Sequence, residues 1–467
     1  MPVTRAQRDP KRPYNDYDSD RETSMQKVTA FFTELMRRYL PDPFVFAIGL
    51  TLLTMALAVI VQGQAVTALT TSWGKGFWAL LAFTTQMAVI LAMGYVLATA
   101  PLTDRFLNRL VARVNDPRMA VIVATLVGGI GSYLNWGFGL VVGGIVARKL
   151  ALRVKGVHYP LIIASAYSGF TLYGLGLSAS IPVLISTKGH PLEAQMGVIP
   201  LSDTIFSPAM LITSLVTIIT LPLLNAWLHP KAGQPIKEID RALEEKQQKD
   251  AAPGVDLDEG NTLANRLNNS RLLSYLIGLI GMGYVALHFV QGGSIDLNLI
   301  NFFILFLGIL LLGTPIRYVE KLNEGIRTIS GIILQYPFYA GIMAIMASSG
   351  LVNTFSEAFV KVATPGTLPF WGLISSFVIN FFAPSGGGHW VIQGPFMIEA
   401  AKTIGASVGH TSTAVMLGNA WNDLVQPFWI LPALALSKLK LKDIMGYTVI
   451  MMFWIGIVYS VAILAWG

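Results

Sequence analysis

The sequence predicts an all-α polytopic membrane protein, and two observations lead to that fold class. The first is composition: 53% of the 467 residues are hydrophobic and only 13% are charged, whereas soluble proteins carry about a quarter charged residues. The second is spacing, because charge-free stretches recur, each at least as long as the roughly 20 residues that cross a bilayer. These stretches are 43–74, 119–147, 156–187, 204–230, 272–295, 297–316, 328–356, 362–398 and 444–467.

The N-terminal segment differs from the rest of the chain. Residues 1–30 are polar and mixed in charge, without the apolar core of a signal peptide, and we predict a cytoplasmic tail. The chain has no cysteine, which excludes disulfides and thiolate metal sites. Its net charge of +7 comes from Lys and Arg residues that lie mostly between the apolar stretches and not in one basic patch. We therefore predict no nucleic-acid partner.

The positive residues give the orientation. Lys and Arg concentrate in cytoplasmic loops, and only four of the 33 fall outside when the N-terminus is placed in the cytoplasm. We therefore predict a multi-pass protein of the bacterial cytoplasmic (inner) membrane, with its N-terminus in the cytoplasm and its C-terminus outside. The four exceptions are Lys75, Lys188, Lys361 and Lys402.

This topology has about nine full crossings and leaves over two stretches, 118–153 and 367–404. Each leftover stretch is a pair of apolar helices broken in the middle, and each begins and ends on one side. Either could be two full crossings or a re-entrant hairpin. Glycines at both breaks favour hairpins, because irregular backbone at membrane depth needs protein or water around it. The predicted crossings are 43–62, 76–98, 159–182, 207–228, 271–291, 298–314, 328–350, 412–437 and 443–466.

A polar segment divides the crossings into two halves. Residues 31–229 form a first transmembrane repeat with hairpin 118–153, and residues 270–467 form a second with hairpin 367–404. Residues 230–269 between them are rich in Lys, Glu, Asp and Gln. We predict a cytoplasmic linker there, with one short helix around Glu238 to Lys249.

The two halves match when the chain is shifted by 249 residues. Leu102 then falls on Leu351, and the break at 135–139 falls on the break at 384–388. The span at 76–98 runs into the cytoplasm whereas its counterpart at 328–350 runs out of it, so the repeat is inverted. Inverted repeats with interrupted helices indicate a secondary carrier, although chance similarity between apolar helices is the alternative.

Four segments carry polar groups where lipid is unfavourable to them. A helix that stops inside a membrane exposes N–H groups at one broken end and carbonyls at the other. The N–H end suits a carboxylate, and the carbonyl end with Ser, Thr and Asn oxygens suits Na⁺. Glycines would let the backbone approach an anion and adopt positive φ. The segments are 131–139, 168–180, 383–395 and 418–427.

We predict that these segments form one substrate site. His389 could donate to a substrate carboxylate, take part in proton coupling, or be structural. The Asn side chains could contact substrate or simply join helices. The predicted substrate contacts are Asn135, Gly137, Ser168, Thr171, Ser385, Gly386, Gly387, Gly388, His389, Asn419 and Asn422.

Asp423 is the only carboxylate in a stretch that otherwise runs uncharged from Thr403 to Ser437. An Asp at the centre of a span costs about 2.5–3.5 kcal/mol on the insertion scale, so a functional role is the default interpretation. We predict that it holds the coupling ion, H⁺ or Na⁺, with Ser132 and Ser178 as further contacts. The alternative is a structural Asp that caps the second half of a broken helix.

The sequence contains no P-loop, Rossmann glycine pattern, zinc-protease motif or nucleophile elbow, so we predict no enzyme activity, no ATP-driven transport and no cofactor. No Lys or Arg lies in the central spans, so helix dipoles and hydroxyls must hold an anion. That favours a small monocarboxylate. A passive channel is a further alternative, but no charged pore ring supports it.

Several motifs carry a resemblance to a known family. They are Arg38-Tyr-Leu-Pro-Asp-Pro-Phe-Val-Phe-Ala47, Asn135-Trp-Gly-Phe-Gly-Leu140, Gly386-Gly-Gly-His-Trp-Val391 with Gln393-Gly-Pro-Phe-Met397, Gln426-Pro-Phe-Trp429 and Asp443-Ile-Met-Gly-Tyr447. At these residues the chain resembles the bacterial short-chain fatty acid transporters, the acetoacetate and butyrate uptake carriers. The resemblance extends over most of the chain from about Phe31.

The resemblance implies a symporter of short-chain fatty acids or small monocarboxylates, in contact with membrane lipid. That family is similar to a wider ion transporter superfamily, which implies a scaffold domain, a mobile transport domain with two re-entrant hairpins, elevator-like movement and a homodimer. Dicarboxylate carriers of the superfamily have Ser-Asn-Thr at the hairpin tips, and this chain does not, so the coupling ion stays open between H⁺ and Na⁺. A carrier of a dicarboxylate or a peptide-like anion on the same scaffold is the alternative.

Overall fold

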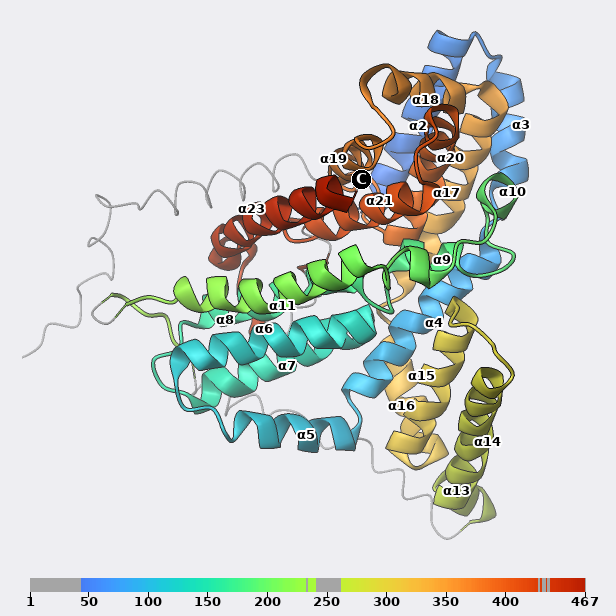
Figure 1. Ribbon diagram of the computed structural model, residues 1–467. Coiled ribbons are helices and arrows are strands. Elements are labelled where there is room, and N and C mark those ends of the chain that lie inside the picture. Colours follow the sequence, from blue (N-terminus) through green and yellow to red (C-terminus); the bar gives the residue numbers. More distant parts are fainter. Residues whose placement is uncertain are drawn as a thin grey trace, which may run out of the picture.

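The protein is helical in every regular element of the part that the structure describes (Figure 1). The computed structural model describes residues 43–231, 234–240, 262–426, 429–430, 434 and 437–466. The predicted tail at 1–30 and most of the predicted linker lie outside those residues. Of the short helix expected around 238–249, only residues 238–240 are described, and they are not helical. The all-α fold class is confirmed.

Helices α6 and α7 of the first half form a hairpin whose turn is the single residue Asn135. Asp116 caps the first arm by accepting a hydrogen bond from the Met119 N–H at 2.8 Å, and Pro117 provides the first helical residue. Asn135 has extended backbone, which stops this arm, and it caps the second arm by accepting from the Phe138 N–H at 2.7 Å. The elements are α2 (Pro43–Gln62), α3 (Val66–Gly76), α4 (Leu81–Ala98), α5 (Pro101–Val111), α6 (Pro117–Leu134) and α7 (Trp136–Arg153).

The next crossing is interrupted, as its polar composition predicts. Its first helix tightens into a 3₁₀ turn and then becomes extended at Gly176. A Cβ at Gly176 would lie 2.2 Å from the Tyr133 carbonyl oxygen, so a side chain there would force the break away from the hairpin. The elements are α8 (Tyr159–Ser168), η1 (Gly169–Leu175), α9 (Ser180–Ile185), α10 (Glu193–Met196), η2 (Leu201–Asp203) and α11 (Pro208–Trp227).

The second half repeats this design with a longer hairpin turn. Residues 380–385 separate the two arms, and Ser385 caps the second arm by accepting from the Gly388 N–H at 3.4 Å. The helix after the hairpin ends at Asn422, where the chain leaves helical structure. The elements are α13 (Leu263–Asn268), α14 (Arg271–Val290), α15 (Leu297–Leu312), α16 (Pro315–Ile326), α17 (Ser330–Ser349), α18 (Leu351–Val362), α19 (Leu368–Ile379), α20 (Gly386–Ile404), α21 (Val408–Asn422) and α23 (Leu441–Trp466).

The internal repeat found in the sequence is present in the structure. Helices α4 and α17 begin at Leu81 and Ser330, and α8 and α21 begin at Tyr159 and Val408, so both pairs keep the 249-residue shift. Packing repeats as well, because α4 contacts α7 as α17 contacts α20, and α6 contacts α8 as α19 contacts α21. The short helices α5 and α18 lie on opposite sides of the molecule (Figure 1), as expected for an inverted pair.

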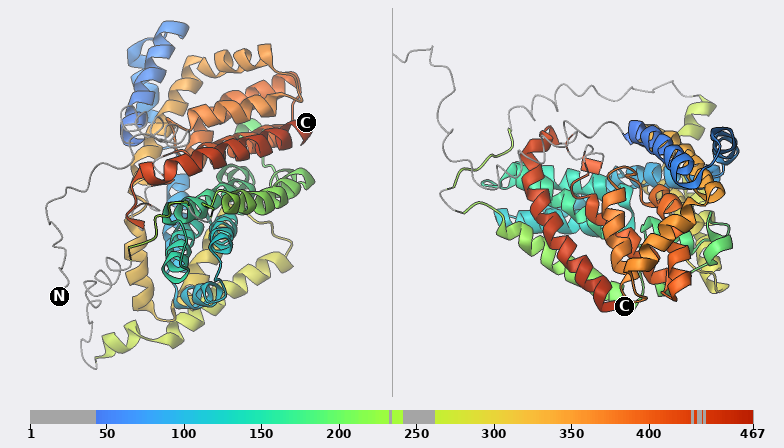
Figure 2. Two further views of the ribbon diagram at one scale, coloured as in Figure 1. Left: turned by 90° about the vertical axis from the view of Figure 1, so that its left-hand side faces the viewer. Right: turned by 90° about the horizontal axis from the view of Figure 1, so that it is seen from above.

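The two halves are interleaved rather than side by side. Helices α2 and α3 pack against α17 of the second half, and α15 and α16 pack against α4 of the first. At the far end of each repeat, α11 packs along α23, as both views in Figure 2 show. Helices α4 and α17 therefore each pack on one side against helices of the other half.

Eight of the described helices are long and apolar enough to cross a membrane. Seven coincide with predicted crossings, and the eighth, Pro117–Leu134, is an arm of the first predicted hairpin. Two predicted crossings differ. Helix α15 ends at Leu312 after 16 residues, about 24 Å at 1.5 Å per residue. The crossing at 412–437 is broken after α21. Helix α3 was not predicted, and the depth and orientation of the hairpins in the bilayer stay predictions.

Residues 234–240 of the linker bind across the ends of two helices. The Lys237 N–H donates to His158 Nδ1 at 3.1 Å, and the Tyr159 N–H donates to the Lys237 carbonyl oxygen at 2.8 Å. Lys237 Nζ also lies 3.2 Å from Asp443 Oδ1, and Ile239 is buried. This segment therefore ties the start of α8 to the start of α23.

The linker segment 234–240 should detach from the start of α8 in acid. Burial, helped by the nearby His229 and Lys237, lowers the pKa of His158 from 6.5 to about 4. Because the folded-state pKa is lowered, the stabilising contribution is complete above pH 6.5 and is lost as the pH falls towards 4, when protonated Nδ1 can no longer accept from Lys237. Hydrogen exchange corrected for intrinsic rates should show the Lys237 amide protected at pH 7 and unprotected near pH 4. Equal protection at both pH values, with α16 amides as the reference, would contradict this.

Candidate functional site

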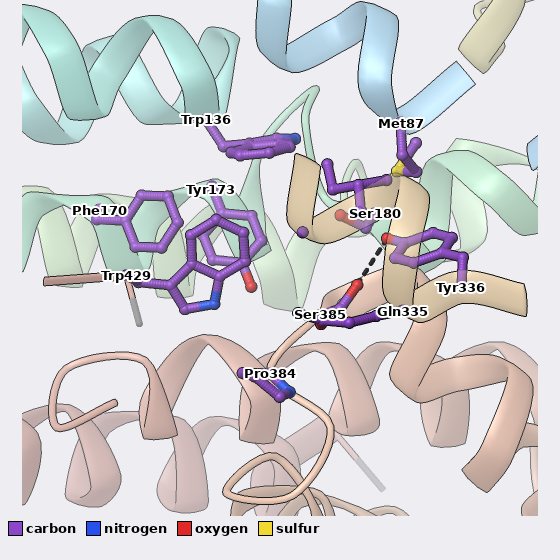
Figure 3. Close-up of a pocket in the computed structure, with 13 residues that line it drawn as sticks. Met87, Trp136, Phe170, Tyr173, Ser180, Gln335, Tyr336, Pro384, Ser385 and Trp429 are labelled. Atoms are coloured by element: carbon purple, nitrogen blue, oxygen red, sulfur yellow. Dashed lines mark hydrogen bonds between the residues drawn. The ribbon is translucent and has the colours of Figure 1, made fainter. Parts of the chain in front are cut away.

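A narrow pocket, with a cavity volume of about 20 Å³, lies where the interrupted segments of both halves meet (Figure 3). Both hairpin breaks reach it, and the interrupted segment η1–α9 and helices α4 and α17 complete its walls. The prediction that the breaks converge on one pocket is therefore confirmed by the geometry. The lining residues are Met87, Trp136, Phe170, Tyr173, Ser180, Gly331, Ile332, Gln335, Tyr336, Pro384, Ser385, Gly386 and Trp429.

Three helices begin at this pocket. Trp136, Ser180 and Gly386 are the first residues of α7, α9 and α20, and all three line it. Helix N-termini carry partial positive charge and free N–H groups, so they attract anions. None of the described lining residues carries a formal charge. The pocket can therefore hold a negative group without placing it in a salt bridge.

Aromatic rings form one wall of the pocket. The Trp429 ring lies 5.4 Å from the Trp136 ring and 5.8 Å from the Phe170 ring, measured between centroids. Phe170 stacks on Tyr173 at 4.6 Å. Figure 3 shows these four side chains together on one side of the pocket, facing Met87, Ser180 and Tyr336. An apolar tail would contact this wall while a polar head group faces the helix ends.

The second hairpin tip presents a hydroxyl pair to the pocket. Ser385 Oγ lies 2.6 Å from Tyr336 Oη of α17, and the dashed line in Figure 3 marks this contact. Tyr336 in turn packs against Phe83 of α4, with 5.6 Å between ring centroids. The N-cap of α20 is thus held by a side chain from α17, a helix of the same half of the chain.

The three glycines after Ser385 are needed for close packing. We expected positive φ at Gly386–Gly388, and this expectation is wrong, because all three residues lie in the first turn of α20 and none has positive φ. A Cβ at Gly387 would lie 2.1 Å from Phe83 Cζ, and one at Gly388 would lie 2.6 Å from Tyr339 Cδ2. Only Gly386 of the three lines the pocket.

The first hairpin tip is held against α4. Asn135 caps α7 with its side-chain oxygen and donates from Nδ2 to the Ile90 carbonyl oxygen at 3.4 Å. Gly94 permits this contact, because a Cβ there would lie 2.3 Å from Asn135 Oδ1. A Cβ at Gly137 would lie 3.0–3.2 Å from atoms of Leu91. Both predicted residues therefore position the tip, and the neighbouring Trp136 is the one that reaches the pocket.

Behind the pocket, Asp423 belongs to a closed ring of four side chains. Its Oδ2 lies 2.7 Å from Tyr173 Oη, and its Oδ1 lies 2.8 Å from Asn380 Nδ2. Tyr173 Oη also lies 2.5 Å from Asn419 Oδ1, and Asn419 Nδ2 bonds to Asn380 Oδ1. All four side chains are buried, with Asp423 only 1% exposed. We refer to these four side chains as the carboxylate ring.

Tyr173 connects the carboxylate ring to the pocket. It lines the pocket while its hydroxyl contacts both Asn419 and Asp423. Gly386 approaches the same place, because its Cβ would lie 3.4 Å from Asn419 Oδ1. The alternative role for Asp423 was a cap on the next half-helix. In the part of the chain that the structure describes, the Asp423 carboxylate bonds to the side chains of Tyr173 and Asn380. Asp423 directly follows the last residue of α21.

The other predicted contacts lie around the pocket and the carboxylate ring. Ser178 Oγ donates to the Ser132 carbonyl oxygen at 2.6 Å, so these two predicted ion contacts join each other, and no bond joins them to Asp423. Ser168 accepts from Asn225 Nδ2 at 2.9 Å, away from the lining residues. The remaining placements are Thr171 bonded to the Ala420 carbonyl oxygen and Tyr459, His389 bonded to Gln393, and Asn422 bonded to Asn380.

A family model for "Short chain fatty acid transporter" matches residues 24–465 of the chain. The chain belongs to the short-chain fatty acid transporter family. Two relatives, of Escherichia coli (strain K12) and Haemophilus influenzae (strain ATCC 51907 / DSM 11121 / KW20 / Rd), are each named "Putative short-chain fatty acid transporter". They are 39% identical over 444 and 431 residues, covering 94% and 91% of this chain and 99% and 96% of theirs. Because these relatives are named as transporters, the chain is a multi-pass membrane transporter and not an enzyme.

Two solved structures share the fold of this short-chain fatty acid transporter family member. The YdaH transporter of Alcanivorax borkumensis, described as having an unusual topology, matches with TM-score 0.57 and 14% identity, covering 91% of this chain and 98% of that one. MtrF of Neisseria gonorrhoeae, described among antimetabolite efflux pumps, matches with TM-score 0.54 and 15% identity, covering 94% and 96%. At these identities the likeness concerns the fold alone.

Sequence reasoning missed three residues of this transporter's centre. Tyr173 lay inside a segment that we singled out, but a tyrosine there was indistinguishable from packing. Asn380 is the only asparagine in the charge-free stretch 362–398, where Gln393 is the other side-chain amide, and its place four residues before the break at 384 was a usable signal. Tyr336 directly precedes Pro337, in a span that we did not count among the interrupted segments. Only the fold brings it to Ser385.

The triple glycine makes a packing prediction. Gly387→Ala should destabilise the transporter by about 1–3 kcal/mol, because overpacking the contact with buried Phe83 forces side chains or backbone to move. Thermal unfolding of the purified protein measures this, with Gly366→Ala as the matched control, since nothing lies within 4 Å of a Cβ at Gly366. If both variants unfolded at the wild-type midpoint, the close approach of α20 to α4 would be wrong.

Proposed function

We propose that this family member is a secondary active symporter of short-chain fatty acids and other small monocarboxylates, such as acetoacetate or butyrate, coupled to H⁺ or Na⁺ in the bacterial inner membrane. The observation that carries the proposal is the single pocket between both hairpin breaks, next to a buried carboxylate. Alternating access needs one site that both halves can share, and interrupted repeats supply it. The names of the relatives support the substrate class.

The pocket suits a carboxylate with a short apolar tail. The first turns of α7 and α20 and the Ser385 and Tyr336 hydroxyls offer hydrogen-bond donors to an anionic head group. The aromatic wall of Trp136, Phe170 and Trp429 offers an apolar surface to a tail of a few carbons. Since no lining residue within the described ranges is cationic, a second carboxylate on the substrate would lack a counter-charge.

A carrier of a dicarboxylate or peptide-like anion is the second candidate. The absence of Lys and Arg from the described pocket lining favours the monocarboxylate, because a doubly charged ligand is costly to bury without cations. Competition separates the two, since succinate in excess should leave the uptake of labelled butyrate or acetoacetate unchanged. Strong inhibition by succinate would favour the dicarboxylate carrier.

The domain movement and assembly are part of the same proposal. The second arms of the hairpins, α7 and α20, contact α4 and α17, which are also the helices that contact α2, α3, α15 and α16. We propose that α4 and α17 form the boundary between a scaffold and a mobile transport domain with an elevator-like movement. A homodimer is the assembly that this arrangement is expected to adopt.

Asp423→Asn tests the coupling. This variant should fold and insert, because Asn keeps the shape of Asp, but gradient-driven uptake of labelled butyrate should fall to the level of protein-free liposomes. Size-exclusion chromatography of the purified variant provides the folding control. A second control is Glu399→Gln, which neutralises an exposed carboxylate on α20. Wild-type accumulation by Asp423→Asn would reject its coupling role.

A further inference from the structure

The carboxylate ring has four contacts between its side chains and few hydrogens to fill them. Its four contacts join Asp423 to Tyr173, Tyr173 to Asn419, Asn419 to Asn380, and Asn380 back to Asp423. The three contacts of 2.5–2.8 Å have the lengths of hydrogen bonds, and the fourth is also a hydrogen-bonding contact. Each of the four contacts therefore requires one hydrogen between its two atoms.

An ionised Asp423 leaves the ring one hydrogen short. The Tyr173 hydroxyl has one hydrogen, and each amide presents its nitrogen to one neighbour and its oxygen to the other. That gives three hydrogens for four contacts. As oriented, the amides leave the Asp423–Tyr173 contact without a hydrogen, because Tyr173 donates to Asn419. Turning both amides over moves the deficit to the Asn380–Asp423 contact, and turning over only Asn419 moves it to the Asn419–Asn380 contact. Turning over only Asn380 leaves two contacts without a hydrogen, so no orientation of the amides removes the deficit.

We propose that Asp423 carries the missing hydrogen on its carboxyl group, so that the cation moved with each substrate is a proton bound in the carboxylate ring. This inference rests on the proposed symport and deepens it by naming the coupling ion. Asp423 Oδ2–H then donates to Tyr173, Tyr173 donates to Asn419, Asn419 to Asn380, and Asn380 back to Asp423 Oδ1. Every contact of the ring has one donor in this arrangement.

The surroundings of Asp423 suit a neutral carboxyl group. Within the described ranges, no Lys, Arg or His forms an ion pair or hydrogen bond with it. The titratable groups that face it are phenols: Tyr167 of α8, which donates to its backbone oxygen, and Tyr173 of η1. Tyr459 of α23 bonds to Thr171, and His389 of α20 bonds to Gln393. A buried carboxylate without a cation is costly, and a proton removes that cost.

The ring does not have the spacing of a sodium site. Cations of this size bind oxygens at about 2.3–2.6 Å, so two oxygens that share one at right angles lie about 3.3 Å apart or more. Tyr173 Oη lies 2.7 Å from Asp423 Oδ2 and 2.5 Å from Asn419 Oδ1. These oxygens are bonded to one another through hydrogens, and a sodium ion would have to separate them.

Tyr173 transmits the protonation state to the substrate. When the O–H bond of Asp423 breaks, the released proton enters the solution on the side to which the site is open. A carboxylate charge then remains next to Tyr173, which lines the pocket, and this charge repels an anionic substrate. Proton and substrate are therefore bound together and released together. One monocarboxylate with one proton carries no net charge, so transport is electroneutral.

Proteoliposomes test the coupling ion directly. After subtraction of protein-free liposomes, an imposed pH gradient should drive accumulation of labelled acetoacetate without sodium, and clamping the membrane potential at different values should not change it. Accumulation driven by a Na⁺ gradient and not by a pH gradient would overturn the proton and leave the symporter intact. No uptake of any monocarboxylate under either gradient would overturn the proposed function, upon which this inference rests.

Infrared spectroscopy tests the protonation without transport. The wild-type minus Asp423→Asn difference spectrum, recorded in lipid nanodiscs at neutral pH, should contain the carbonyl band of a protonated carboxylic acid. The matched Glu399→Gln difference should contain carboxylate bands instead. Tyr173→Phe should move the acid band to higher wavenumber, because the acid loses its acceptor, and this variant serves if Asp423→Asn fails to fold. Carboxylate bands alone at Asp423 would overturn the proposal.

Discussion

A helix that ends inside an apolar body leaves backbone N–H groups that must find partners nearby, and the centre of this transporter is organised by that constraint. Asn135 and Ser385 meet it at the two hairpins by capping α7 and α20. Both caps are held from outside their hairpin, Asn135 by the Ile90 carbonyl of α4 and Ser385 by Tyr336 of α17. The first residues of α7, α9 and α20 line the pocket, so the same interruptions that require support also form its walls.

Buried polar side chains gather near these helix ends. Asn380, Asn419, Asn422, Asp423 and Gln426 are at most 1% exposed, and they bond mainly to one another and to the tyrosines of neighbouring elements. A polar group without a partner in such a low-dielectric interior loses its full hydration, so each hydrogen bond of this network contributes to its stability. Gain or loss of a single proton therefore changes the balance of several side chains together, and this is the property expected of a coupling element.

Much of the fold could be predicted from hydropathy and charge, whereas the ring could not. The 249-residue shift placed the breaks at 135 and 384 correctly, because turn residues inside apolar stretches are visible in the sequence. Asp423, which the structure places in the ring, was singled out because a carboxylate in a charge-free stretch is conspicuous. Tyr173, Asn380 and Tyr336 were missed because their importance comes from partners far away in sequence. The glycines misled us about φ, since a small residue indicates close approach without telling what approaches.

The interleaving of the two halves has a consequence for biogenesis. Helix α4 is made early, yet its neighbours α15 and α16 are synthesised roughly two hundred residues later, and α17 meets α2 and α3 only after the linker has emerged. The first half thus enters the bilayer with one flank of α4 facing lipid or the insertion machinery instead of protein. Completion of the core waits for the second half, so the transporter matures as one cooperative unit and not as two independently finished modules.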